Sequence, residues 1–410
     1  MISVENERTM PRKKYSLTFL IAGAVLVVFG VLFKVAFYTP AVYDLPFFIV
    51  YIGAAVFIYG GLQMARRKKL GDEVVFSRGR MKDFFLKNAL IFALLILVVV
   101  VAVISPNFVQ NDVLLDILSQ SSIKLIIALG ICMTLLIAGT DLSAGRMVGL
   151  SALISASMLQ NPTYANRFFP GMPQLPVFLP IVLAILACGC FGAVNGFLVA
   201  KYNMHPFIAT LATQVIIYGV ASVYFDLPPN NSQPLGGVRS DFTVIAQKKF
   251  FGNKVSILIP IAIAITLIMW FILNKTVFGK NIYAIGGNME AARVSGVNVF
   301  KTLMGIFILA SLLYGFGGTL EAARTAGATN EYGNGYELDA IAACCVGGVS
   351  LAGGIGKVSG IVTGVLIFTV IQYGLQFIGV NPYWQQVIKG IIIAVAVAID
   401  LSKYKKVLWH

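Results

Sequence analysis

Long apolar segments, each about the length of a membrane-spanning helix, recur along the whole chain. An α-helix rises about 1.5 Å per residue, so about 20 mostly apolar residues cross the roughly 30 Å hydrocarbon core of a bilayer. Of the 410 residues, 58% are hydrophobic and 12% are charged, and that charged fraction is about half the value for a soluble domain. The predicted fold class is therefore an all-α polytopic membrane protein. A soluble enzyme, a disordered chain and a disulfide scaffold are excluded.

The apolar segments predict twelve helices, of which 147–160 and 337–350 are short. Both short segments adjoin glycine-rich stretches, so we expect broken or tilted helices there instead of full spans. The twelve segments are 17–38, 45–65, 86–105, 117–138, 147–160, 177–200, 207–226, 255–274, 303–323, 337–350, 356–378 and 385–401.

A shift in composition separates the first two segments from the rest. A basic run at 66–69 opens a polar stretch that continues to about Lys82. We therefore predict two parts. The first, 1–82, holds an N-terminal cytoplasmic segment, a two-helix transmembrane hairpin and a basic linker. The second, 83–410, is a ten-helix core.

The positive charge of the chain indicates its orientation in the membrane. A net charge of +14 in a soluble protein would suggest binding to nucleic acid. If the N-terminus is cytoplasmic and every segment crosses, 22 of the 31 Lys and Arg fall at inner stretches and five at outer stretches. Cytoplasmic loops carry such an excess, so the sequence predicts that both termini are cytoplasmic and no nucleic acid is bound. The outer five are Arg167, Arg239, Lys248, Lys249 and Lys254.

The sequence predicts no metal site, no cofactor bound by this chain and no catalytic residue. The five cysteines lie within apolar runs, and the two histidines are His205 and His410, whereas a zinc or iron–sulfur site needs three or four converging ligands. The run 353–357 ends in Gly-Lys, but Leu351 and Val358 stand where a nucleotide-binding loop needs Gly and Ser or Thr. A membrane enzyme is the least favoured class, because no nucleophile and base occur together.

Glycines four residues apart predict close packing between helices. Small residues at this spacing let two helix backbones approach within a membrane. Such an interface could be static, or it could move during a functional cycle, and the spacing does not decide between the two. The residues concerned are Gly145, Gly149, Gly192, Gly196, Gly356, Gly360 and Gly364.

The loop 275–302 on the predicted inner side carries the signature of a short capped helix. Asn288 is a good N-cap, Glu290 would lie in the first turn where the helix dipole favours an acid, and Gly296 suits a left-handed terminus. The prediction is a two-turn helix over 289–295, with Ala291 and Ala292 exposed. A helix this short is marginal alone in water, so it is either an ordinary capped loop or an element that docks on a partner.

Several charged residues fall within or beside the predicted spans, where ionised groups are costly. Glu321 and Arg324 are three residues apart on one helix face and can pair. Glu337 and Asp339 begin a short helix, where they could stabilise its N-terminus or line a path. Asp141 could likewise cap the helix that follows it or line a pore.

Four motifs, in order along the chain, resemble the transmembrane subunit of ribose/galactose-type ABC sugar importers. The resemblance covers about 86–402, so the hairpin 17–65 is not part of it. Within the family, 141–146 and 379–384 are most similar to galactose/methyl-galactoside permeases. The motifs are Gly-Thr-Asp-Leu-Ser-Ala-Gly at 139–145, Ala-Ile-Gly-Gly-Asn-x-Glu-Ala-Ala-Arg-x-Ser-Gly at 284–296, Tyr-Glu-Leu-Asp-Ala-Ile-Ala-Ala at 336–343 and Gly-Gly-x-x-x-x-Gly-Gly-x-Gly at 347–356.

The resemblance implies a homodimer of two permeases in a bacterial cytoplasmic (inner) membrane. Its partners would be a cytosolic ABC ATPase, which holds ATP and Mg, and an extracytoplasmic sugar-binding protein that meets the outer loops 161–176 and 227–254. The permease domain 83–410 would import a monosaccharide such as galactose, methyl galactoside or glucose. The coupling loop 275–302 would contact the ATPase through Gly286, Gly287, Asn288, Glu290, Ala291, Ala292, Arg293, Ser295 and Gly296.

A sugar path needs amides, hydroxyls and aromatic faces, because monosaccharides are neutral polyols. The alternatives that remain open are import of ribose, another monosaccharide or nucleosides by the same architecture, and an ion-coupled secondary transporter. The residues proposed for the path are Asp141, Ser143, Asn195, Glu337, Asp339, Asn381 and Trp384.

Overall fold

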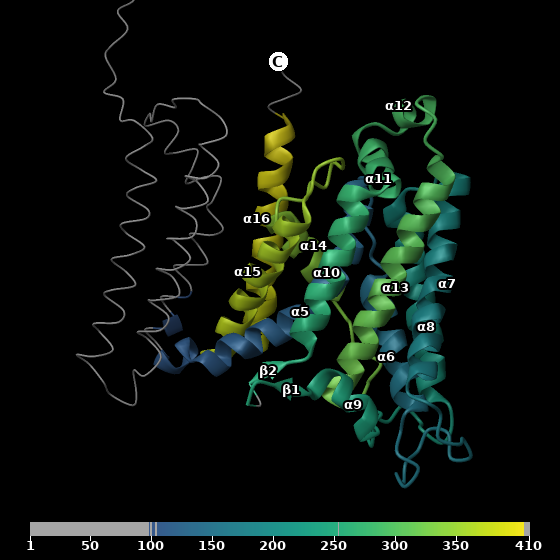
Figure 1. Cartoon of the computed structure of the whole chain (residues 1–410), viewed down its shortest axis with the longest axis vertical. Helices are drawn as coiled ribbons and strands as arrows, with labels where there is room; N and C mark the ends of the chain where they lie inside the picture. Colours follow the sequence, from purple (N-terminus) through teal and green to yellow (C-terminus); the bar gives the residue numbers. More distant parts are fainter. Residues whose placement is uncertain (1–97, 99–100, 103–104, 253, 406–410) are drawn as a thin grey trace, which may run out of the picture. The chain divides into compact units, whose positions relative to one another are not determined.

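A computed structural model describes residues 98, 101–102, 105–252 and 254–405 (Figure 1). The chain divides into two compact units, Met1–Leu114 with Val370–Val380 and Leu115–Thr369 with Asn381–His410. The predicted segments 17–38 and 45–65 and the basic linker, together with the boundary predicted at 82/83, lie outside the described residues, as does most of 86–105.

The described residues are mostly helical, which confirms the predicted all-α class. Residues 249–256 add a short antiparallel hairpin, in which Lys249 pairs with Ser256 and Phe250 with Val255. The described elements in chain order are η2 (Pro106–Val109), α5 (Asn111–Leu136), α6 (Ala144–Met158), α7 (Phe178–Tyr202), α8 (Pro206–Asp226), α9 (Ser240–Gln247), β1 (Lys249–Phe250), β2 (Val255–Ser256), α10 (Leu258–Lys275), α11 (Val277–Gly287), α12 (Met289–Val294), α13 (Val299–Thr325), α14 (Tyr336–Val346), α15 (Val358–Phe377) and α16 (Pro382–Lys405).

Six of the described helices are long and apolar enough to cross a membrane, namely α5, α7, α8, α10, α13 and α15. Helices α6 and α14 have 15 and 11 residues, which at about 1.5 Å per residue is less than a bilayer's hydrocarbon thickness. They are the two segments that the sequence predicts to be short.

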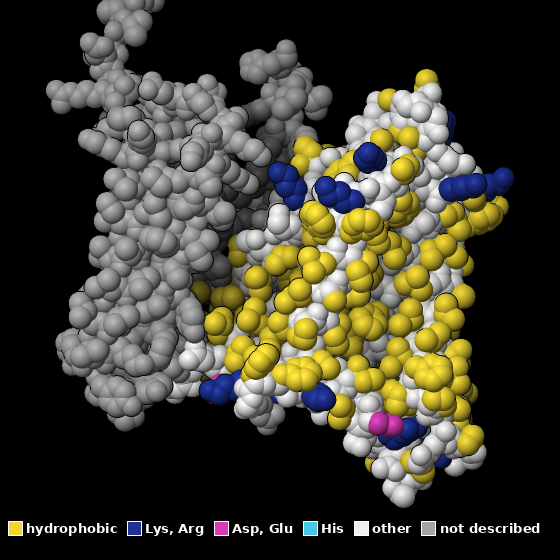
Figure 2. Space-filling model, in the orientation of Figure 1, with side chains coloured by type: hydrophobic (Ala, Val, Ile, Leu, Met, Phe, Trp, Pro, Cys, Tyr) yellow, Lys and Arg dark blue, Asp and Glu magenta, His cyan; other side chains and the backbone are white. Residues whose placement is uncertain are grey.

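The surface of the described part is that of a membrane protein. Figure 2 shows hydrophobic side chains across a broad band of the visible face, with Lys and Arg gathered above and below it. On α10, Ile263, Leu267 and Phe271 form an exposed stripe at a spacing of four residues. Such a continuous apolar surface would be unfavourable in water, so the band identifies the part of the molecule that faces lipid.

Helix α13 lies at the centre of the second unit, against α6 and α7. Gly192 of α7 packs directly against Phe307 and Ser311, and Gly318 of α13 packs against Val148 of α6. A Cβ atom at either glycine would collide with backbone oxygen on the facing helix. The fold therefore depends on glycine at these crossings, because only glycine permits so close an approach.

Candidate functional site

A six-residue helix, α12, projects at one end of the second unit (Figure 1). Asn288 caps it, because the Asn288 side chain accepts a hydrogen bond from the backbone N–H of Ala291 at 2.9 Å. Within the helix, Arg293 donates to Glu290 at 3.1 Å, and Gly296 follows with a φ of +87°. The helix is thus a rigid, self-capped element with charges of both signs on its surface.

One prediction for α12 is wrong. Ala291 is exposed as expected, whereas Ala292 is only 5% exposed and belongs to the hydrophobic core. Successive helix positions point about 100° apart, so the helix turns residue 292 toward the core and presents residue 294 instead. The exposed apolar side chain is therefore that of Val294, which is 89% exposed.

Helix α11, which the sequence analysis missed, supports α12. Thr276 caps it, because its side chain accepts a hydrogen bond from Gly279 N–H at 3.2 Å. Ile282 and Ile285 are buried on its inward face. The capping threonine and these apolar residues are the signal that could have revealed it, although Lys280 and Asn281 interrupt the apolar pattern.

The contacts of α11 fix its place against the end of the bundle from which α12 projects. Gly286 packs against the backbone of Leu136, at the end of α5, and against Gly354 in the loop before α15. The Tyr283 hydroxyl donates to the Gly356 carbonyl at 3.0 Å. Burial raises the pKa of Tyr283, so its hydroxyl stays protonated and remains a donor. These contacts join α11 to the end of α5 and to the loop that precedes α15.

A chain of buried hydrogen bonds joins three of the predicted path residues, Asp141, Ser143 and Asn195. Asn195 donates to the Ser143 hydroxyl at 3.0 Å, and that hydroxyl donates to Asp141 at 2.6 Å. Thr213 of α8 donates to the Asn195 carbonyl oxygen at 2.7 Å. Asp141 also accepts from the backbone N–H of Ser143 at 2.9 Å.

This chain of hydrogen bonds locks the start of α6 to α7 and α8. Asp141, Ser143 and Asn195 are fully buried, and they do not line the pocket described next. Buried polar groups require partners, and Asn195, Ser143 and one oxygen of Asp141 find theirs in this chain of hydrogen bonds. Their arrangement is that of a structural connection within the helical core.

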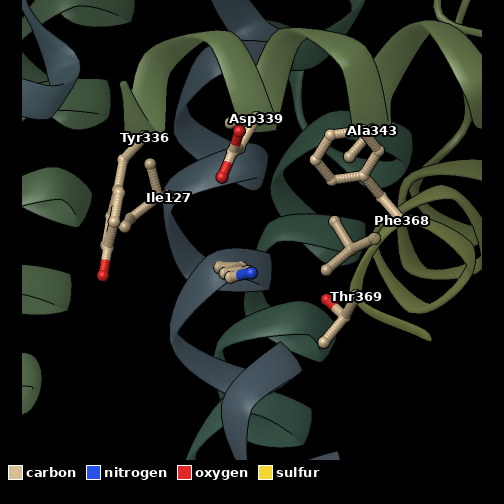
Figure 3. A pocket seen from close by; sticks show the side chains of 9 residues that line it. Ile127, Tyr336, Asp339, Ala343, Phe368 and Thr369 are labelled. Atoms are coloured by element: carbon tan, nitrogen blue, oxygen red, sulfur yellow. The ribbon is translucent and has the colours of Figure 1, made fainter. Parts of the chain in front are cut away.

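A small pocket lies where α5, α14 and α15 meet. Figure 3 shows Tyr336 and Asp339 pointing into it from α14, with Phe368 and Thr369 on α15. Lys124 of α5 also lines it. Asp339 forms an ion pair with Lys389 of α16, so one buried carboxylate lies among two lysines of different helices.

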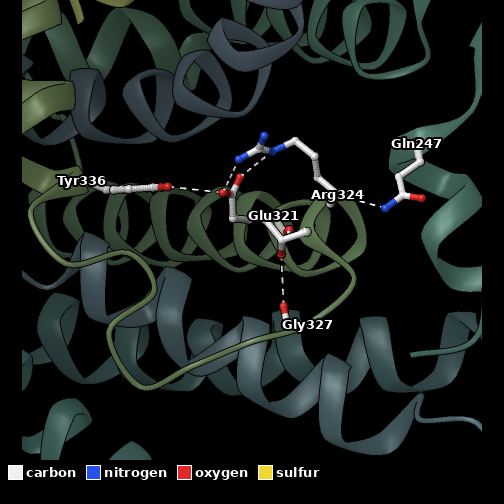
Figure 4. A network of polar contacts seen from close by, with 6 residues as sticks. Gln247, Glu321, Arg324, Gly327 and Tyr336 are labelled. Carbon is white, nitrogen blue, oxygen red and sulfur yellow. Dashed lines mark hydrogen bonds and ion pairs between the residues drawn. The ribbon is translucent and has the colours of Figure 1, made fainter. Parts of the chain in front are cut away.

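A second polar network lies at the C-terminal end of α13 (Figure 4). Glu321 and Arg324 form the predicted pair, with Arg324 donating to Glu321 at 2.7 Å. The Tyr336 hydroxyl donates to the same carboxylate at 3.3 Å. Gln247 of α9 donates to the Arg324 carbonyl at 2.9 Å. The network therefore connects α9, α13 and the start of α14.

Glu337 is buried in the first turn of α14, and the glycines of α6 pack against it. Gly145 lies against the Glu337 carboxylate and Gly149 against the Tyr332 carbonyl. Arg146, one of the 22 Lys and Arg that the sequence assigns to inner stretches, belongs to the first turn of α6, with its guanidinium 4.3 Å from the centre of the Tyr218 ring. The charge of Arg146 is therefore not a loop charge.

The other predicted residues lie apart from these networks. Asn381 is exposed and accepts a hydrogen bond from the backbone N–H of Tyr383 at 2.9 Å, which makes it the cap of α16. Trp384 is exposed in the first turn of the same helix. Gly196 packs against Met304 of α13.

The glycines of α15 pack along a neighbouring segment. Gly360 and Gly364 meet the backbone of Gly347 and Ala343, at the end of α14, and Gly356 meets Leu136 and Val349. No group of His, Cys, Asp and Glu that could hold a metal ion occurs among the described residues.

Six described helices of membrane-spanning length, a glycine-packed core and a capped helix at one end are the architecture of a polytopic integral-membrane protein. Residues 113–397 match the family described as the permease component of the branched-chain amino acid transport system. The chain belongs to this family of permeases.

The chain is also similar to individual import permeases. It is 52% identical to the galactose/methyl galactoside import permease protein MglC of Haemophilus influenzae, over 79% of this chain and 96% of that protein. It is 48% identical to MglC of Escherichia coli, over 78% of this chain and 96% of that protein. It is 36% identical to the ribose import permease protein RbsC of Haemophilus influenzae, over 77% and 94%. No solved structure matches it.

Proposed function

We propose that the chain is the transmembrane subunit of an ATP-binding cassette importer that carries galactose or methyl galactoside into the cytoplasm. The similarity to galactose/methyl galactoside permeases, at 52% identity, supports this sugar over ribose, for which the relatives are 36% identical. ATP and Mg belong to a separate ATPase, and this chain supplies the membrane path and the mechanical link to it.

The single observation that carries the proposal is the geometry of α11 and α12. Helix α12 is capped at both ends, and its exposed surface carries Glu290, Arg293 and Val294. A short helix in isolation is marginal, so a rigid and exposed one fits a docking surface. Helix α11 connects it to Leu136 and Gly354, which supplies the route by which ATPase movement reaches the membrane helices.

The proposed assembly contains two copies of this chain, two ATPase subunits and one extracytoplasmic sugar-binding protein. The ATPases contact α12 on the cytoplasmic side, where both termini also lie, in the bacterial inner membrane. The binding protein meets the loops 161–176 and 227–254 on the opposite side.

For the sugar path, the proposal keeps Glu337 and Asp339, because Asp339 lines the pocket between α5, α14 and α15. Asn381 and Trp384 stay candidates at the start of α16. The hydrogen bonds of Asp141, Ser143 and Asn195 favour a structural role for those three residues.

The proposal is tested by changing the apolar tip of α12. Val294→Asp places a charge where the ATPase would dock, and we expect the ATPase to be lost from the purified complex. The matched control is Val244→Asp, the same substitution at an exposed valine of α9 near the opposite end of the bundle. The complex that carries this control variant should retain the ATPase. Equal ATPase retention by the two variants would show that α12 is not the docking element.

A further inference from the structure

The hairpin β1–β2, which begins within the loop 227–254, carries a compact exposed surface of its own. Its tip is Phe251, which is 86% exposed, and Phe250 beside it is also exposed. Three lysines surround these rings, namely Lys248, Lys249 and Lys254, all exposed. Two aromatic side chains among three cations form a small amphipathic patch.

The hairpin holds this patch in a defined shape. Phe250 pairs with Val255 across the strands, and the backbone N–H of Ile257 donates to the Lys248 carbonyl at 2.9 Å. Phe251 has a φ of +52°, a left-handed conformation that is unfavourable for a bulky side chain. Glycine or asparagine would suit this position better, so the aromatic side chain occupies it at a conformational cost.

The depth of the hairpin follows from the length of the next helix. Helix α10 begins at Leu258, two residues after β2, and has 18 residues. At about 1.5 Å per residue it is about 27 Å long, which is barely the hydrocarbon thickness of a bilayer. The whole helix is therefore needed to cross, and the residues just before Leu258 must lie at the boundary between hydrocarbon and headgroups.

The position of the hairpin along α10 also suits a lipid contact. Figure 1 places β1 and β2 at the end of α10 that lies away from α12. The exposed stripe of Ile263, Leu267 and Phe271 runs along the same helix. The hairpin thus continues a surface that already faces lipid.

Its charges are unusual for that side of the membrane. Of the five Lys and Arg assigned to the outer stretches by sequence, three belong to this hairpin, namely Lys248, Lys249 and Lys254. Basic residues there act against the usual orientation bias, but they attract the phosphates of anionic phospholipids. Aromatic rings at the same level anchor a protein at the interface.

We propose that the β1–β2 hairpin is a membrane-interface anchor, which buries Phe251 among phospholipid headgroups while Lys248, Lys249 and Lys254 bind their phosphates. The anchor fixes the height and tilt of α10 in the bilayer. In this arrangement the hairpin contacts lipid, and the rest of the loop 227–254 stays free to contact a partner protein.

Quenching of a single tryptophan by brominated phospholipids tests the proposal. The full chain, with Trp270, Trp384 and Trp409 replaced by Phe, receives Phe251→Trp and is reconstituted in phospholipid nanodiscs. We expect a blue-shifted emission and about twofold quenching by brominated lipid, because an interfacial ring lies within contact of the acyl chains. The matched control is Gln233→Trp in the same background, an exposed position in the same loop, which brominated lipid should leave unquenched.

Two further arms separate the roles of the rings and the lysines. Brominated anionic lipid should quench Phe251→Trp about twice as strongly as brominated zwitterionic lipid at equal mole fraction, because the lysines enrich it locally. Changing the three lysines to glutamine should abolish that difference. The proposal is overturned if Phe251→Trp is quenched by aqueous iodide like the control. It is equally overturned if its emission responds to the sugar-binding protein and not to lipid.

Discussion

The side-chain amide of Asn195 on α7 donates a hydrogen bond to the hydroxyl of Ser143, 3.0 Å away at the start of α6. The two residues are 52 positions apart in the chain and both are fully buried. Through this bond the amide positions the hydroxyl that donates to Asp141. One asparagine thus holds a short helix, α6, within the bundle.

Replacing Asn195 with leucine should destabilise the protein. The change leaves buried hydroxyls of Ser143 and Thr213 without the amide, which costs about 1–3 kcal/mol in the free energy of unfolding. Denaturant titration of the purified chain in detergent measures the loss. Asn274→Ala, at an exposed position, is the control and should change stability by at most about 0.5 kcal/mol. Equal stability of the two variants would contradict the structural role assigned to the network.

Adjacent glycines at the end of α11 should respond differently to alanine. A Cβ at Gly286 would meet the Leu136 carbonyl and the Gly354 amide, whereas a Cβ at Gly287 has nothing within 4 Å. We expect Gly286→Ala to lower the thermal unfolding midpoint, since overpacking against backbone costs about 1–3 kcal/mol. Gly287→Ala should leave the midpoint unchanged. The packing of α11 against α5 would be wrong if Gly286→Ala were also neutral.

The ion pair between Asp339 and Lys389 should contribute to stability as a unit. Lys389→Gln removes one partner of a largely buried pair, and the expected loss is about 3 kcal/mol in unfolding free energy. Adding Asp339→Asn should not restore that loss, because Lys124, which lines the same pocket, then loses the carboxylate as well. Lys357→Gln, at an exposed lysine, is the control. Equal stability of Lys389→Gln and the control would contradict the contribution of the ion pair.

Sequence alone predicted the helices well because apolar length determines them. The predicted segment 177–200 corresponds to the helix Phe178–Tyr202, and 207–226 corresponds to Pro206–Asp226. Within lipid, a long apolar segment must satisfy its backbone hydrogen bonds internally, and a helix does so. The short segment 337–350 became Tyr336–Val346. These boundaries follow from local properties of the chain.

Sequence could not predict which side chains are buried or meet between helices, because this depends on the orientation of each helix about its own axis. The prediction that Ala292 is exposed was wrong, because a helix of six residues is too short for its sequence to show which face is buried. Asn195 and Ser143 were both proposed for a sugar path, which stays a prediction, and sequence could not show that their side chains meet each other. Asn381 was grouped with them by chemistry, whereas the structure places it at the cap of α16.

The central claim is ATP-driven sugar import through this chain, and uptake into sealed vesicles tests it most directly. Vesicles would contain the full chain and its ATPase, with the sugar-binding protein outside, ATP inside and radiolabelled galactose or methyl galactoside as substrate. The account predicts uptake that requires ATP and all three proteins, with ribose taken up poorly. Uptake driven by a proton or sodium gradient in the absence of ATP and the ATPase would contradict it.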